Sequence, residues 1–375
     1  MSIPIGVLKN DEVAIFRLRE LYGKYGYMRY KVSKFEEYDL YARNKSFLIS
    51  ENILTFTDTD GRLMALKPDV TLSIIKNLGK TEQETHKLCY NETVYRTSAS
   101  ADGFREIMQT GLECVGKIDL YSVCEVIMLA QKSLDLISTD NILDISHMGF
   151  ILALMEELDV EGADADTLIG YIGCKNIPAI RAFCRERGLS DKDIETLCEI
   201  TALYAPIKSA LRVIEKSLRN EKMRQAYDEL CGICEILQVS GDIDRIYIDF
   251  STVNDMNYYN GVIFKGFVNG IPDGILSGGR YDNLMKKMGK NAGAVGFAVY
   301  LDMLDRLNTE APRYDVDTVL LYGEDSDMSE VARVAAGLRE SGKTVRTERG
   351  SSTALRCRQL MAVTKSGVEV LKTND

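Results

Sequence analysis

The sequence has no tryptophan and only two histidines, His86 and His147, among its 375 residues. Zinc sites and many other metal sites in proteins rely on histidine or paired cysteines. Ser–His and Cys–His catalysis needs a histidine beside the nucleophile. Two histidines far apart in the chain argue against both, so we expect no bound metal and no histidine-activated nucleophile.

Cysteines are present but lack the spacing of a functional cluster. Nine are scattered along the chain, and only Cys231 and Cys234 form a close pair. No second pair or histidine pair accompanies them at zinc-site spacing. We interpret them as reduced thiols, mostly buried in helices, as is typical of a cytoplasmic protein.

The chain also lacks a basic surplus and a long apolar run. Its net charge is −10 and its pI about 5.1, whereas nucleic-acid-binding surfaces usually show as an excess of lysine and arginine. No apolar run approaches the roughly 18 residues of a membrane span. The N-terminus, MSIPIGVLKNDEV, has no basic segment before an apolar core, so we predict no signal peptide. We expect neither a tRNA nor a membrane partner, and a cytoplasmic location.

Length and pattern indicate more than one domain. A polar segment containing Pro312 predicts a linker between a core at 1–310 and a tail at 311–375. Within the core, residues of about 150–240 have leucine, alanine and charged residues at helical spacing. We predict a helical insertion there.

Local signals place several elements of the core. Asn10 and Asp119 are candidate helix caps, and Asp58–Gly61 is a hairpin turn between two short strands. Pro68 and Asp69 predict a helix start. A polar ligand site is expected there, since a strand–turn–helix brings polar side chains to a helix N-terminus.

A long antiparallel pair is predicted over residues 90–116. Because side chains alternate along a strand, Gln109, Gly111 and Glu113 share one face. The alternation alone leaves open whether Glu113 lines a site or faces solvent.

The most informative stretch is the glycine-rich segment from Ile275 to Leu304. A Gly278–Asp282 turn precedes a second glycine-marked segment, 293–298, and Tyr258 and Tyr259 lie upstream. Glycine lets a backbone approach a ligand closely, and paired tyrosines offer hydroxyls to a polar substrate. We predict the floor of an amino-acid pocket; a merely structural turn is the alternative. Only one tyrosine need face the ligand, and we favour Tyr259.

Four segments in this order resemble a class II aminoacyl-tRNA synthetase core of the histidyl-tRNA synthetase type. The resemblance covers about residues 5–310 and rests on Leu66-Lys-Pro-Asp-Val-Thr71, on Val94-Tyr-Arg96 with Gln109-Thr-Gly-Leu-Glu113, on Tyr258-Tyr259-X-Gly with Gly278-Gly-Arg-Tyr281, and on 295–304. It implies an α+β fold: an antiparallel sheet core with a helical insertion and a truncated α/β C-terminal domain.

The resemblance also implies site residues. Those expected to bind histidine are Asp69, Thr71, Gln109, Glu113, Tyr258, Tyr259 and Tyr281. Arg96 and Arg105 stand where the synthetases keep the arginines of motif 2, and we interpret them as vestigial.

Three departures from the synthetase pattern affect the nucleotide side, meaning the part of the site where a synthetase binds ATP. Asn254 stands in place of the arginine that promotes adenylation, Met303 in place of the arginine that holds the ATP γ-phosphate, and Ser98 in place of an acidic residue. Losing one such electrostatic contact costs roughly 10²–10³ in rate. A site that keeps its amino-acid groups and loses its phosphate groups should bind without reacting.

This combination resembles the regulatory subunits of ATP phosphoribosyltransferase, the synthetase-like partners of a short catalytic subunit in histidine biosynthesis. The resemblance implies a hetero-octamer, a homodimer joined through about residues 27–41, and feedback inhibition by histidine. It implies no catalytic residue and no cofactor. A tail of roughly 60 residues is short for an anticodon-binding domain, which usually needs about 100. The alternatives are an active or degenerate histidyl-tRNA synthetase and an amino-acid-binding paralogue with another partner.

Overall fold

The computed structural model describes residues 8–48, 52–79, 84–98, 101–241, 243–253, 258–307 and 313–374. The chain divides into two compact units, Met1–Leu307 and Asn308–Asp375. The first unit contains the predicted pocket.

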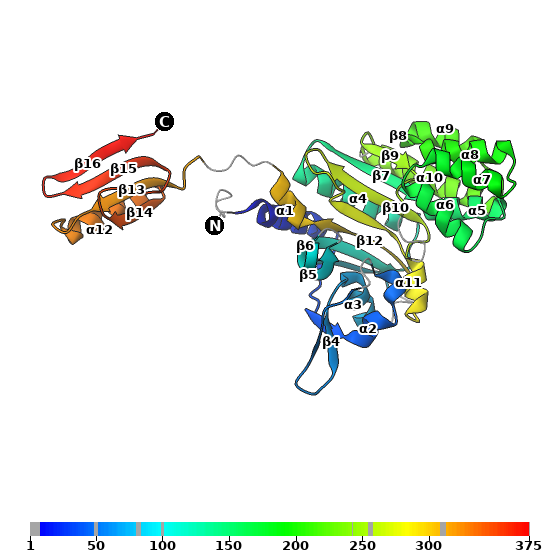
Figure 1. Cartoon of the computed structure of the whole chain (residues 1–375), viewed down its shortest axis with the longest axis horizontal. Helices are drawn as coiled ribbons and strands as arrows, with labels where there is room; N and C mark the ends of the chain where they lie inside the picture. Colours follow the sequence, from blue (N-terminus) through cyan, green and yellow to red (C-terminus); the bar gives the residue numbers. More distant parts are fainter. Residues whose placement is uncertain are drawn as a thin grey trace. The chain divides into compact units, whose positions relative to one another are not determined.

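A nine-stranded sheet organises the first unit (Figure 1). In spatial order its strands are β1 (Met28–Arg29), β5 (His86–Ser98), β6 (Ala101–Gly116), β12 (Gly293–Tyr300), β11 (Leu276–Arg280), β10 (Val262–Val268), β7 (Asn141–His147), β9 (Ile246–Asp249) and β8 (Tyr204–Pro206). All neighbours are antiparallel except β1 with β5 and β7 with β9. The predicted α+β fold with an antiparallel core is confirmed.

Two helices cover one face of this sheet. The helix α4 (Leu120–Ile137) starts at Asp119, whose carboxylate accepts a hydrogen bond from the Ser122 amide, as predicted. Its long buried stripe packs with α1 (Asn10–Lys24) against sheet residues that include Phe264 and Phe297. The predicted Asn10 cap was wrong by one position. Lys9, whose backbone is extended, is the N-cap, and its amide donates to the Glu12 carboxylate.

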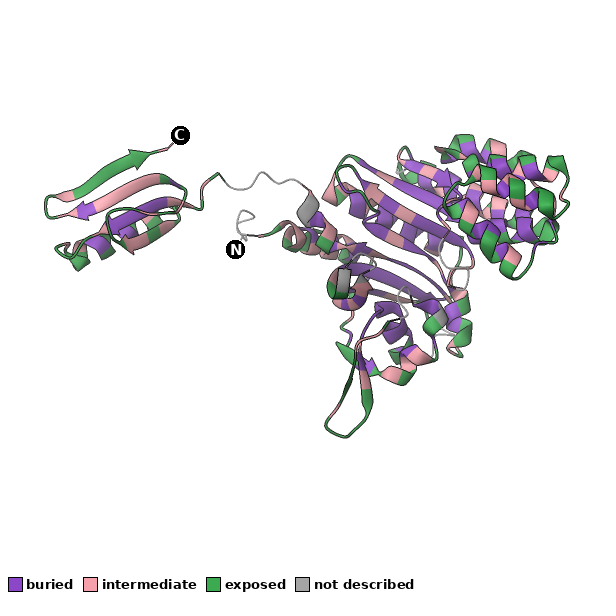
Figure 2. Cartoon of the chain, viewed as in Figure 1, coloured by how far each residue is buried: buried purple, intermediate pink, exposed green. Residues whose placement is uncertain are grey.

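The helical insertion follows β7 and returns to the sheet at β8 and β9. Its helices are α5 (Met148–Glu157), α6 (Ala163–Gly173), α7 (Ile177–Glu186), α8 (Asp191–Ala202), α9 (Ile207–Lys216) and α10 (Glu221–Ser240). The side chains of Asn176, Ser190 and Asn220 cap α7, α8 and α10. Its inward-facing apolar residues join the main core, while the outer faces of its helices are exposed (Figure 2).

A smaller layer lies over the β5–β6 end of the main sheet. It contains the antiparallel strands β2 (Phe35–Glu37), β4 (Leu63–Leu66) and β3 (Thr55–Thr57), with α2 (Tyr38–Ala42), the 3-10 turn Lys45–Phe47 and α3 (Val70–Asn77). The hairpin at Asp58–Gly61 is confirmed. Asp69 caps α3 by accepting from the Leu72 amide at 2.8 Å.

The predicted turn at Gly278–Asp282 was wrong. Gly278 and Gly279 lie inside strand β11, and the chain turns only at Tyr281, before α11 (Asp282–Lys287). Close packing requires the first glycine. A Cβ at Gly278 would lie 2.4 Å from the carbonyl oxygen of Gly296 on the neighbouring strand.

The second unit is a four-stranded sheet with one helix. Its strands, in the order β14 (Val345–Arg349), β13 (Val316–Tyr322), β15 (Cys357–Thr364) and β16 (Gly367–Thr373), are parallel except for the β15–β16 pair. The helix α12 (Met328–Glu340) connects β13 to β14. The last 25 residues, which the sequence pattern leaves ambiguous, contain both β15 and β16.

Among the described residues, no helix is both long and apolar enough to cross a membrane.

The crowding at Gly278 gives a stability prediction. Gly278→Ala should lower the free energy of unfolding by about 1–3 kcal/mol, because the new methyl group meets backbone that cannot move aside. Gly170→Ala is the matched control. Gly170 lies in α6, where an added methyl group would meet nothing within 4 Å, so alanine should stabilise by up to about 1 kcal/mol. Urea unfolding measures both, and a Gly278→Ala protein as stable as the wild type would contradict the packing argument.

Candidate functional site

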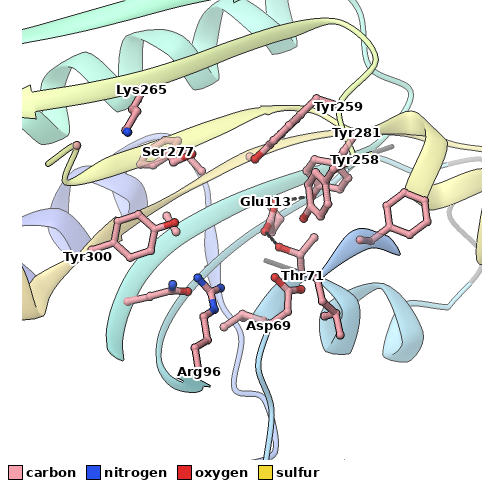
Figure 3. Close-up of a pocket in the computed structure, with 18 of the residues that line it drawn as sticks. Asp69, Thr71, Arg96, Glu113, Tyr258, Tyr259, Lys265, Ser277, Tyr281 and Tyr300 are labelled. Carbon is pink, nitrogen blue, oxygen red and sulfur yellow. Dashed lines mark hydrogen bonds between the residues drawn. The ribbon is translucent and has the colours of Figure 1, made fainter. Parts of the chain in front are cut away.

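A cavity of about 500 Å³ opens on the sheet face that α1 and α4 leave uncovered (Figure 3). It is bounded by the strands at the centre of the sheet, by the start of α3 and by the segment before β10. Eight of the nine predicted site residues line it: Asp69, Thr71, Arg96, Gln109, Glu113, Tyr258, Tyr259 and Tyr281. The ninth, Arg105, is exposed outside it, opposite Arg96 in the β5–β6 pair.

Strand register explains the floor of this cavity. One row of cross-strand neighbours runs Lys265, Ser277, Ala298, Gly111, Tyr90 from β10 to β5. The three central members are small, and larger side chains stand at both ends of the row. A row of small residues between large ones leaves a hollow on that face of the sheet.

The next row places glycines beside the predicted acidic residue. Gly279 and Gly296 are neighbours, and Gly296 lies opposite Glu113. A Cβ at Gly296 would lie 1.8 Å from a carboxylate oxygen of Glu113, and one at Gly279 would lie 2.7 Å from the ring of Tyr259. Both glycines are needed because they make room for the side chains that line the pocket.

Glu113 is the buried centre of the site. Its side chain accepts hydrogen bonds from the Thr71 hydroxyl at 2.7 Å and from the Tyr281 hydroxyl (Figure 3). Only 2% of the residue is exposed. The structure therefore places Glu113 on the cavity side of its strand, not in solvent.

Burial shifts the ionisation of both acidic groups in the pocket. It raises the pKa of Glu113 to about 8, against the opposing effect of the Tyr281 and Thr71 hydrogen bonds, and the nearby Asp69 raises it further. Burial also raises the pKa of Asp69, although the Arg96 guanidinium opposes that shift. This shift favours the protonated form of Glu113 near neutral pH. A cation bound beside it would favour the carboxylate and displace the proton.

The end of the cavity near α3 is held by the backbone. Asp69 is fixed by its capping bond, and Thr71, in the first turn of α3, is fixed by its bond to Glu113. The Arg96 side chain donates to the carbonyl oxygen of Pro68 at 2.8 Å and is buried. These bonds fix the polar groups before any ligand binds.

Aromatic rings form one wall. The centroids of Tyr258 and Tyr259 are 4.6 Å apart, and Tyr281 and Phe47 lie 5.6 and 6.1 Å from Tyr258. Both tyrosines line the cavity. The preference for Tyr259 as the residue that faces the ligand stays a prediction.

The opposite end presents hydrogen-bond donors. Gln109 is 2% exposed, and its side-chain nitrogen has no hydrogen-bond partner in the described structure. Lys265, Ser277 and Tyr300 lie at the same end (Figure 3). Sequence reasoning missed these three and Tyr90, because finding them requires the register between strands that are distant in the chain.

The three departures on the nucleotide side differ in what the structure shows. Met303 lines the cavity. Asn254 lies outside the described residues, and only the backbone of Ser98 is described, at the end of β5.

Within the described part of the chain, no cluster of three or more histidine, cysteine or acidic side chains could hold a metal ion. The nine cysteines are free thiols. His147 accepts from the Phe150 amide at the start of α5 and contacts Glu229 at 3.1 Å.

Comparison with known sequences gives the chain its relatives. A family model described as histidyl-tRNA synthetase matches residues 8–304. The ATP phosphoribosyltransferase regulatory subunit of Clostridium kluyveri is 32% identical over 338 residues, covering 87% of this chain and 85% of that protein. The protein of the same name from Oceanobacillus iheyensis is 29% identical over 350 residues, with 92% and 85% covered.

Solved structures agree on the fold. One described as an ATP phosphoribosyltransferase regulatory subunit/histidyl-tRNA synthetase from Bacillus halodurans has a TM-score of 0.73 at 24% identity, covering 94% of both chains. Histidyl-tRNA synthetase from Nostoc has a TM-score of 0.71 at 18% identity, covering 94% of this chain and 87% of that one. A chain of the ATP phosphoribosyl transferase (HisG:HisZ) complex from Thermotoga maritima has a TM-score of 0.61 at 20% identity, covering 78% and 97%.

The raised pKa of Glu113 predicts a pH-dependent stability. Its folded-state pKa of about 8 lies above the ordinary value of 4.5, so the folded protein holds a proton that the unfolded chain releases. The contribution of Glu113 to the free energy of unfolding should therefore fall as pH rises from about 4.5 to about 8. Glu113→Gln cannot ionise and should show a smaller fall between about pH 5.5 and about pH 8.5.

Urea unfolding of the ligand-free protein at both pH values tests this. Glu235→Gln, at an exposed helix position, is the control and should follow the wild type. Equal pH dependence in the wild type and in Glu113→Gln would show that Glu113 ionises normally.

Proposed function

Because this chain belongs to the histidyl-tRNA synthetase family and, within it, to the ATP phosphoribosyltransferase regulatory subunits, we propose that it acts as such a subunit. It binds the short-form catalytic subunit, supports the first step of histidine biosynthesis and makes that step sensitive to histidine. It performs no chemistry of its own. The Thermotoga maritima structure, described as a HisG:HisZ complex, supports a partnership between the two kinds of subunit.

The observation that carries the proposal is the contrast between the two sides of one cavity. On one side, Glu113 is buried and bonded to Thr71 and Tyr281, an arrangement suited to a ligand with cationic or hydrogen-bond-donating groups. On the other, Met303 lines the cavity at the position where a synthetase keeps an arginine for phosphate. A thioether cannot stabilise the charge that develops on phosphate during adenylation.

Histidine fits the retained side. Its α-ammonium group is matched by Asp69 and Thr71, and its imidazole by Glu113 and the tyrosines around it. A bound histidine would hold the smaller layer with α3 against the main sheet, since both contribute residues to the cavity. Inhibition follows if the assembly binds histidine more tightly in its inactive state than in its active state.

Histidyl-tRNA synthetase activity is the second candidate, since the family model and a structural neighbour are of that type. It requires ATP to bind beside histidine and predicts histidine-dependent exchange between ATP and pyrophosphate. The methionine at position 303 argues against it.

We also propose that the chain forms a homodimer within a hetero-octamer and works in the cytoplasm. The homodimer and the hetero-octamer follow from the family, in which a paired regulatory core assembles with catalytic subunits. Sedimentation of the mixture would give the stoichiometry.

Reconstitution tests the function directly. Adding this protein to the short catalytic subunit from the same organism should raise the rate of phosphoribosyl-ATP formation, and histidine should reverse that gain. The absorbance of the product measures both effects. A mixture no faster than the catalytic subunit alone would reject the proposal, and ATP–pyrophosphate exchange would then test the synthetase alternative.

Binding tests the site. Glu113→Ala removes the buried acceptor and should weaken histidine binding by at least about tenfold, since hydrogen bonds to charged groups contribute about 1.5–3 kcal/mol. Arg105→Ala, an exposed residue of the same hairpin, is the control and should match the wild type in calorimetric titration. Full affinity in Glu113→Ala would place the effector elsewhere.

A further inference from the structure

Lys265 is a positively charged residue that lines the cavity, and none of the histidine contacts proposed above involves it. It lies on β10, where its cross-strand neighbours are Asp144 and Ser277. Of the described residues that line the cavity, only Lys265 and Arg96 carry a positive charge. The two differ in what surrounds them. Arg96 is buried beside Asp69 and bonded to a backbone carbonyl.

No carboxylate in the described structure lies within 4 Å of the Lys265 ammonium group. Its strand neighbour Asp144 has one oxygen without a hydrogen-bond partner, and Asp273, at the exposed rim of the cavity, forms no ion pair with it. The ammonium group lies over the ring of Phe267, 5.4 Å from the centroid. Lys265 acts on Asp144 only at longer range, as a minor influence against the burial that raises the pKa of that carboxyl, so no direct ion pair occupies its ammonium group.

The backbone fixes the course of the side chain. A Cβ at Gly274 would lie 2.4 Å from Cε of Lys265 and 2.8 Å from its Cγ. The aliphatic part of the lysine thus lies directly on Gly274, and the ammonium group reaches the end of the cavity that holds Ser277 and Tyr300 (Figure 3). Any larger residue at position 274 would displace it.

The spacing between Lys265 and Glu113 suits a short dipolar ligand. Strands β10 and β6 are separated by β11 and β12, so the two Cα atoms lie roughly 14 Å apart across the strands and about 7 Å along them. The Lys265 side chain extends toward Gly274 and Phe267, whereas the Glu113 carboxyl is bonded to Thr71 and Tyr281 at the other end of the cavity. The remaining gap lies between an acceptor, Glu113, and donors, Lys265 with the unpartnered amide of Gln109.

We propose that Lys265 forms a carboxylate subsite of this cavity, so that an amino acid binds with its cationic groups toward Glu113 and Asp69 and its carboxylate toward Lys265. The subsite rests on the proposed function, since it assumes that histidine occupies the cavity. It assigns the lysine a role in specificity: distinguishing an amino acid from the corresponding amine. An ammonium–carboxylate pair at a partly buried site provides that discrimination.

Paired titrations of the full-length protein with L-histidine and with histamine, which lacks the carboxylate, test the subsite. The wild type should bind histidine more tightly than histamine. Lys265→Met should weaken histidine about ten- to a hundredfold and histamine far less, so that the ratio of the two affinities approaches one. Lys117→Met, at an exposed position outside the cavity, is the control and should keep the wild-type ratio.

A second variant, at Gly274, retains the charge of Lys265 but moves its side chain. Gly274→Ala should displace the Lys265 side chain and lower the histidine-to-histamine ratio, while Lys265→Arg should restore part of the ratio lost in Lys265→Met. Thermal unfolding of each variant establishes that the fold is intact.

The outcomes separate this inference from the proposed function. A wild type that binds no histidine overturns the proposed function, and the subsite with it. Histidine binding by the wild type with an unchanged ratio in Lys265→Met overturns the subsite alone. Equal loss of both ligands in Lys265→Met also overturns it, because that result indicates a structural role for the lysine.

Discussion

The burial of one carboxyl group, that of Glu113, constrains the rest of this site. A buried carboxyl needs hydrogen-bond partners, and the Thr71 and Tyr281 hydroxyls supply them. Thr71 belongs to α3 and Tyr281 lies between β11 and α11, so one carboxyl group joins the smaller layer to the main sheet. The space for it exists because the facing position, Gly296, has no side chain. The glycine-rich strands, the cap of α3 and the tyrosine wall are all arranged around this acid.

Much of this arrangement follows from short-range patterns. Asp69 and Asp119 cap helices as predicted because a capping side chain bonds to amides only a few residues away. Gln109 and Glu113 share a face because strand alternation is fixed by backbone geometry. The resemblance of four ordered segments then supplied the fold class, which no single segment could.

The rest depends on relations between distant segments. Glycine is common in turns, so the sequence predicts a turn at Gly278 and Gly279, but these glycines are required by the packing of β11 against its neighbours. Lys265, Ser277, Tyr90 and Tyr300 enter the site through the order in which five strands pair. The ambiguity at β16 has a different cause: its residues are mostly exposed, so no strong apolar alternation marks the strand.

The strand order also determines when the site can exist. Glu113 lies opposite Gly296, and β7 pairs with β10 only after the whole helical insertion has been made. The insertion helices can form early because their contacts are local. One edge of β6 and one edge of β7 stay unpaired until β12 and β10, which are synthesised much later, are available. A ligand that needs both Thr71 and Tyr281 therefore binds only chains that have completed the central sheet. Such a ligand would draw newly made chains toward the finished core by mass action.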